Sequence, residues 1–141
     1  MRFTYSICDP SENEILFKND KITADQAIKI AREYPWLEKL DISEKNIHAN
    51  VHFSPSLNFK NENSDKEFRI TAHYNPNREL EFSLWYKRVV KTKALFGLFG
   101  EKEKIVVSDA WDYLLQDTLV YLQYFLDEEY ERIESLYTYS I

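Results

Sequence analysis

Three histidines, His48, His52 and His73, have side chains suited to acid–base chemistry or to metal binding. Two histidines beside a cleft, together with a lysine, could act as general acid and base on a phosphodiester. A zinc ion would need three or four ligands that converge at about 2 Å. His48 and His52 are four residues apart in a predicted strand and therefore lie roughly 13 Å apart, too far to share one ion. His73 is expected to face Glu81 across the next hairpin. We interpret all three as ordinary polar residues, and the sequence predicts neither a catalytic residue nor a metal site.

Other candidate nucleophiles and ligands give no stronger signal. Cys8 is the only cysteine, and "ICDP" matches no nucleophile signature, so we expect an unreactive thiol. No serine has glycine neighbours, which excludes the G-x-S-x-G motif. Asp112, Asp117 and Glu128 could be carboxylate ligands on a helix, but no Glu-x-x-His spacing accompanies them. A solvated acidic helix face and no cofactor are the expectation.

Both glycines of the chain, Gly97 and Gly100, lie in "KTKALFGLFGEKEK", residues 91–104. A phosphate-binding loop would continue with Gly-Lys-Ser/Thr, whereas Glu101 follows here, and a dinucleotide fingerprint would need three glycines. The pattern favours a β-hairpin over residues 88–107 with the glycines at its tip. A short helical turn through the same residues is the alternative. The apolar tip either is exposed or packs beneath the last helix.

Composition predicts one folded domain over residues 1–141. Hydrophobic residues make up 44% of the chain and aromatic residues 16%, which is typical of a globular protein with a packed core. The first residues contain no apolar segment of the signal-peptide kind, and no run reaches the roughly 18 apolar residues of a membrane helix. A single cysteine suits a reducing compartment. We therefore expect a cytoplasmic protein that does not bind a membrane.

The charge is unevenly distributed along the chain. Its net value is −6, but residues 109–141 hold eight acidic residues and one basic residue, a net charge of −7, while the other 108 residues carry +1. Residues 87–104 form a basic stretch with a local charge of +4. An acidic C-terminal segment argues against nucleic acid as the main ligand and favours a basic partner.

The pattern of apolar residues predicts an α+β fold. Residues 2–19 are expected to form a hairpin, and Thr23 with Gln26 has the spacing of a capping box for a helix that ends near Pro35. Residues 61–67 are expected to form a loop. Alternating segments predict three further strands, over residues 46–53, 68–74 and 79–86. The inward side chains would include Phe68, Ile70, Ala72, Tyr74, Leu80, Phe82, Leu84 and Tyr86. The sheet would thus be antiparallel, an N-terminal hairpin plus a meander.

A long amphipathic helix is predicted for the C-terminal segment. Ser108 is positioned to cap it, and Asp109 and Asp112 would lie in its first turn, where the helix dipole favours anions. Such a helix would be roughly 40 Å long and would cross the sheet beside the shorter helix. Its apolar stripe would include Trp111, Leu114, Leu115, Thr118, Leu119, Leu122, Phe125, Leu126, Ile133 and Leu136 or Tyr137.

Exposed aromatic residues among carboxylates predict a surface for a protein partner. The expected contact residues are Asp117, Tyr121, Tyr124, Asp127, Glu128, Glu131 and Trp85, with Trp85 beside Arg69 on the outward side of its strand. The partner would be a basic protein such as a toxin or nuclease domain, which the chain would bind and occlude. In size and acidity the chain is similar in type to bacterial immunity proteins, although no stretch identifies one such family.

Two other functions are compatible with the sequence. One is a small-molecule-binding domain or histidine-based hydrolase with a pocket, lined by tyrosines, between the sheet and the long helix. The other is a secretion chaperone, although such chaperones begin with a helix and this chain is expected to begin with a hairpin. The prediction is a binding protein rather than an enzyme, with its oligomeric state left open.

Overall fold

A computed structural model describes residues 2–46, 53–93 and 101–137, and it confirms the α+β class. Six antiparallel strands form one sheet in the order β2-β1-β3-β4-β5-β6. Four helices lie among them in sequence. The elements are β1 (Phe3–Cys8), β2 (Leu16–Ile22), α1 (Ala24–Glu33), α2 (Trp36–Lys45), β3 (Ser56–Asn61), β4 (Lys66–Tyr74), β5 (Leu80–Lys93), β6 (Glu101–Tyr113), α3 (Leu115–Leu126) and α4 (Tyr130–Glu134).

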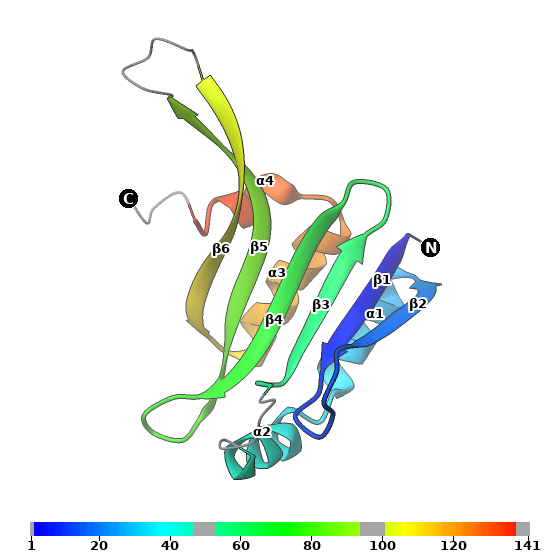
Figure 1. Cartoon of the computed structure of the whole chain (residues 1–141), viewed down its shortest axis with the longest axis vertical. Coiled ribbons are helices and arrows are strands. Elements are labelled where there is room, and N and C mark those ends of the chain that lie inside the picture. The colour runs from blue at the N-terminus through cyan, green and yellow to red at the C-terminus, as the bar shows by residue number, and fades with distance from the viewer. Residues whose placement is uncertain (1, 47–52, 94–100, 138–141) are drawn as a thin grey trace.

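The helices α1, α3 and α4 cover one face of the sheet and leave the other face open (Figure 1). The predicted alternation in β4 and β5 is confirmed, because Phe68, Ile70, Phe82, Leu84 and Tyr86 are fully buried under these helices. The aromatic rings of α3 and the sheet stack directly on one another in this core, which fixes α3 over β4 and β5.

The N-terminal part follows the prediction as far as Pro35. β1 and β2 form the expected hairpin, and Thr23 and Gln26 form both hydrogen bonds of a capping box at the start of α1. Pro35 ends α1 but also begins α2, a helix that the sequence did not indicate. Trp36 anchors α2, since its ring packs edge-on against Phe82 at 5.0 Å and its Nε1 donates to the Ala31 carbonyl.

The predicted strand over residues 46–53 lies mainly outside the described residues, which exclude 47–52. Asn46 is the C-cap of α2 and not part of a strand. The strand that pairs with both β1 and β4 is instead β3, which the sequence did not indicate. Of the loop expected over 61–67, residues 62–65 form a tight turn between β3 and β4, with Asp65 at a positive φ of 57°.

The prediction of one long C-terminal helix was wrong in the bounds of that helix. Ser108 is not a helix cap, because it lies in β6 and pairs with Tyr86 of β5. Asp109 and Asp112 also lie in β6 rather than in a first helical turn. The long strand β5 supplies pairing partners up to Tyr113, so the chain stays extended until α3 begins. At 12 residues, α3 is about 18 Å long.

A second departure is the break between α3 and α4 at residues 127–129, where Glu128 has a positive φ of 60°. The break turns the last helix back over the sheet. Ile133 becomes fully buried there, and the Tyr137 hydroxyl donates to the Leu84 carbonyl at 3.0 Å. Burial of these two side chains provides the physical reason for the break, because one straight helix would carry them away from the core.

The hairpin predicted over residues 88–107 is confirmed in its strands, since β5 and β6 pair from Arg88 with Val106 to Lys93 with Glu101. Its tip, with Gly97, Gly100 and the apolar residues between them, lies outside the described residues. Within residues 2–46, 53–93 and 101–137, no helix has the length and apolar character needed to cross a membrane.

Candidate functional site

The residues predicted for partner binding lie on two different layers of the molecule. Six belong to α3, α4 and the turn between them. Glu128 in the turn is described separately, and we call the other five the helical surface: Asp117, Tyr121, Tyr124, Asp127 and Glu131. Trp85 lies on the open face of the sheet, since its neighbours in β5, Leu84 and Tyr86, both point into the core beneath the helices. The structure therefore does not bring Trp85 together with the helical surface.

The tyrosines of the helical surface form an ordered row. Tyr121 contacts Tyr113 and Tyr124 edge-on, with ring centroids 5.6 and 5.7 Å apart. The Arg132 guanidinium lies over the Tyr124 ring at 5.1 Å. Burial raises the pKa of Tyr113, and the adjacent Tyr121 and the Asp117 carboxylate raise it further. All three tyrosines are half-buried, and contacts between their rings hold them in fixed orientations, so little side-chain entropy remains to be lost on binding.

Several acidic residues of the C-terminal segment are already paired within the molecule. Glu128, one of the predicted contact residues, lies 3.0 Å from Arg2 and accepts a hydrogen bond from the buried Asn61 amide at 3.1 Å. Its carboxylate thus links the turn after α3 to β3 and to the residue that precedes β1. Two further pairs are Glu134 with Arg88 at 2.6 Å and Glu129 with Arg132 at 3.7 Å.

The carboxylates of the helical surface lack such compensation. Asp117, Asp127 and Glu131 are exposed, and none of the described side chains forms an ion pair with them. Asp127 accepts a hydrogen bond from the neutral Gln123 amide. Three exposed carboxylates without an ion-pair partner among the described side chains therefore remain on α3, α4 and the turn between them.

The open face of the sheet carries an aromatic cluster. Trp85 lies opposite Arg69 in the strand register, as predicted, but its ring packs against Trp111, with centroids 5.9 Å apart. Trp111 in turn packs on the His73 ring at 5.2 Å and is 50% exposed. Trp111 was not predicted as a surface residue, because the helical spacing of the apolar residues placed it in the apolar stripe of the C-terminal helix.

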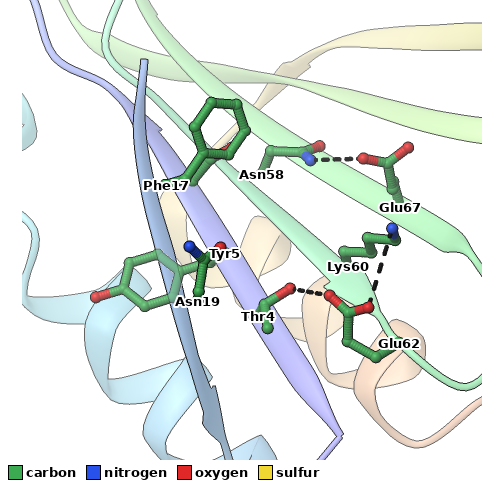
Figure 2. Close-up of a pocket in the computed structure, with 9 residues that line it drawn as sticks. Thr4, Tyr5, Phe17, Asn19, Asn58, Lys60, Glu62 and Glu67 are labelled. Atoms are coloured by element: carbon green, nitrogen blue, oxygen red, sulfur yellow. Dashed lines mark hydrogen bonds and ion pairs between the residues drawn. The ribbon is translucent and has the colours of Figure 1, made fainter. Parts of the chain in front are cut away.

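Two shallow hollows lie on the sheet, and the smaller one borders this cluster. The larger, of about 230 Å³, lies over β1, β2 and β3 (Figure 2). Its polar groups bond to one another: the Asn58 amide donates to Glu67, the Thr4 hydroxyl donates to Glu62, and Lys60 pairs with Glu62. The smaller, of about 70 Å³, is lined by Asn58, Glu67, Arg69, Trp85, Lys87 and Val107. The described residues that line the two hollows include no histidine or cysteine.

His73 faces Glu81 across β4 and β5, as the sequence predicted. An irregularity in the pairing of β5 with β6 adds Asp112, whose φ is +73°. Its Oδ1 lies 3.9 Å from His73 Nε2, and one ligand atom from each of the three residues lies within 4.8 Å of the others. These are the described side chains that could together hold a metal ion. His48 and His52 lie outside the described residues.

Cys8 is half-buried in β1, and burial raises the pKa of its thiol although Arg69 partly opposes this effect. A raised pKa keeps the thiol protonated, whereas an activated nucleophile needs a lowered one. The environment of Cys8 is therefore that of an unreactive cysteine.

Comparison with protein-family models, curated proteins and solved structures gave no match to the chain. What the protein does is therefore inferred from its own surfaces.

Proposed function

We propose that the protein is a small binding module that covers a basic protein, in the manner of an immunity protein that neutralises a cationic toxin or nuclease. One observation carries this proposal. Three exposed carboxylates, Asp117, Asp127 and Glu131, lie on the same two helices and turn as half-buried tyrosines and have no ion-pair partner among the described side chains. Neighbouring acids, by contrast, are paired with arginines.

The two kinds of residue have different roles in the proposed interface. Tyr121 and Tyr124 act as central anchors, because fixed aromatic rings provide contact area at a small cost in entropy. The carboxylates attract lysines and arginines of the partner and speed its association. Glu128 contributes to folding rather than to this contact, and Trp85 belongs to the opposite layer.

The alternatives from the sequence have less support. In the described part of the chain, aromatic rings fill the space between α3 and the sheet, where Phe125 lies 5.7 Å from Phe68 and 6.2 Å from Phe3. A ligand pocket or a histidine-based hydrolase in that space remains a hypothesis. So does a secretion chaperone.

The test is affinity capture from a lysate of the source cells with three folded baits. The first bait is the wild type, and the second carries Asp117→Lys, Asp127→Lys and Glu131→Lys. The matched control carries Glu12→Lys, Glu14→Lys and Asp20→Lys, which changes the net charge equally at exposed positions near β2. We expect the wild type and the control to retain one stoichiometric basic protein that the second bait loses. This binding should weaken as ionic strength rises, because exposed pairs are screened within about 8 Å at physiological salt.

The neutralising role is tested with the captured protein itself. Its expression alone should slow growth, and co-expression of the wild-type chain, but not of the Asp117/Asp127/Glu131 variant, should restore growth. Capture that is equal for all three baits would reject the helical surface as the interface. Loss from both charge-reversed baits would show a response to net charge alone and would also contradict the proposal.

A further inference from the structure

We propose that His73, Glu81 and Asp112 form a binding site for a divalent transition-metal ion such as Zn²⁺. An imidazole nitrogen and carboxylate oxygens are ligands that zinc commonly takes in proteins. The two carboxylates also balance the charge of a divalent ion at this site. The site lies on the open face of the sheet, on the other side of the molecule from the helical surface.

The strand register brings the three ligands together. His73 and Glu81 are directly paired across β4 and β5. The irregular pairing near Ser83 shifts β6 relative to β5, and Asp112 takes a positive φ of 73° there. A positive φ is uncommon outside glycine but is tolerated by aspartate. The donor atoms lie within 4.8 Å of one another, whereas tetrahedral zinc ligands are about 3.3 Å apart when each is about 2.0 Å from the ion. Small side-chain rotations are enough to close the difference.

The state of the imidazole is a second, independent observation. His73 Nδ1 is buried and has no hydrogen-bond partner in the described structure. A buried polar atom without a partner costs roughly 1–3 kcal/mol, and a metal ligand is one way to engage such a ring. A rotation of the ring about Cβ–Cγ exchanges each nitrogen with a ring carbon and not with the other nitrogen, so Nε2, 3.9 Å from Asp112 Oδ1, is the nitrogen that faces the carboxylates.

Neighbouring residues would hold the ligands in place. The Trp111 ring packs on His73 with centroids 5.2 Å apart, which limits the motion of the imidazole. The Asn75 amide donates to the Glu81 carboxylate and orients it, as outer groups do in metal sites. Asp112 is the exposed member, with 78% of its side chain accessible, and leaves the site open to solvent. Three protein ligands would leave the fourth position for water or for a ligand.

The test is calorimetric titration of the full chain with zinc chloride. We expect the wild type to bind one equivalent, and both Asp112→Asn and Glu81→Gln to weaken binding about tenfold or more. Glu79→Gln is the matched control, because it removes an exposed carboxylate two residues from Glu81 but outside the group of ligands. Its affinity should equal that of the wild type. Circular dichroism of each variant checks that the fold is retained.

Two further measurements distinguish this site from other metal-binding groups of the chain. The double variant His48→Ala/His52→Ala should keep wild-type affinity, and zinc should shift the Trp111 indole resonance in a ¹H–¹⁵N spectrum. The proposal is overturned if the folded wild type shows no saturable binding, or if binding survives both carboxylate substitutions. Loss of binding in the His48/His52 variant would likewise overturn it.

Discussion

Removal of the Glu128 side chain should show that acidic residues paired within the molecule stabilise the fold, in contrast to the acidic residues of the helical surface. The carboxylate of Glu128 lies 3.0 Å from Arg2 Nε and accepts from the Asn61 amide at 3.1 Å. Asn61 is fully buried and also donates to the Tyr130 hydroxyl at 3.0 Å. The Glu128→Ala substitution therefore removes an ion pair and one of the two hydrogen bonds that the buried Asn61 Nδ2 donates.

The size of the effect follows from the exposure of each group. Arg2 and Glu128 are 39% and 46% exposed in their side chains, and the Arg2 Nε–H is not aligned with the carboxylate as a hydrogen bond. Such a pair contributes about 0.2–1 kcal/mol. The bond to Asn61 adds about 0.5–1.5 kcal/mol. We expect Glu128→Ala to lower the free energy of unfolding by about 1–2 kcal/mol, and the melting temperature by about 4 °C per kcal/mol.

The backbone gives this prediction an internal check. Glu128 has a φ of 60°, which costs a residue with a Cβ atom about 1 kcal/mol relative to glycine. Glu128→Gly loses the same side-chain contacts but relieves this strain, so it should be less destabilising than Glu128→Ala by about that amount.

Urea denaturation followed by circular dichroism measures both variants, with Glu131→Ala as the control. Glu131 is exposed and has no ion-pair partner among the described side chains, so its loss should change stability by less than about 0.5 kcal/mol. Equal destabilisation by Glu128→Ala and Glu131→Ala would refute the distinction between paired and free acids. A neutral Glu128→Ala would refute it as well.

Two more outcomes concern the core and the pH dependence of stability. Phe125→Ala should lower the free energy of unfolding by about 3–5 kcal/mol, because this fully buried ring contacts Phe68. Val120→Ala, on the exposed side of α3, should change it by less than about 0.5 kcal/mol. Comparable urea midpoints for the two variants would contradict this prediction. Burial alone would raise the pKa of Asp9, but hydrogen bonds from Ser11 and the Lys39 ammonium at 2.9 Å lower it below the ordinary 3.8. The stability that the Asp9 carboxylate contributes is therefore fully present above pH 3.8 and is lost as pH falls through the lower folded-state pKa. Asp9→Asn should then lower the free energy of unfolding by about 1 kcal/mol at pH 7 and leave it unchanged in strong acid. A pH-independent difference between Asp9→Asn and the wild type in thermal melts would show that the charge of Asp9 plays no part.

The strands that alternate strictly could be predicted from the sequence, and the reason is local. In residues 68–74 and 80–86 every second side chain is apolar, so the period itself determines which side chains face the core. The capping box of Thr23 and Gln26 is also a local signal. Helix α2 has no comparable pattern. It is fixed by the packing of Trp36 against Phe82, a contact between residues far apart in the sequence.

The C-terminal segment shows how pairing with a distant strand overrides local preference. Residues 108–113 carry a serine and aspartates at positions suited to a helix start, yet they pair with β5 because that strand extends far enough to accept them. The position of Asp112 depends on an irregularity in this pairing, which no spacing in the sequence reveals. For that reason its approach to His73 and Glu81 could not be predicted, while the pairing of His73 with Glu81 could.

The same folding contacts reduce the charge that a partner would meet. Of the eight acids after residue 108, three are paired with arginines, and Asp112 faces His73 on the open side of the sheet. The net charge of the segment therefore overstates the field at the helical surface, where three carboxylates remain. With so few charges, salt should act mainly on the association rate of a partner and lower the affinity by the same factor, while the dissociation rate changes little. The affinity of such an interface would then depend chiefly on Tyr121 and Tyr124, whose apolar contacts are not screened by salt.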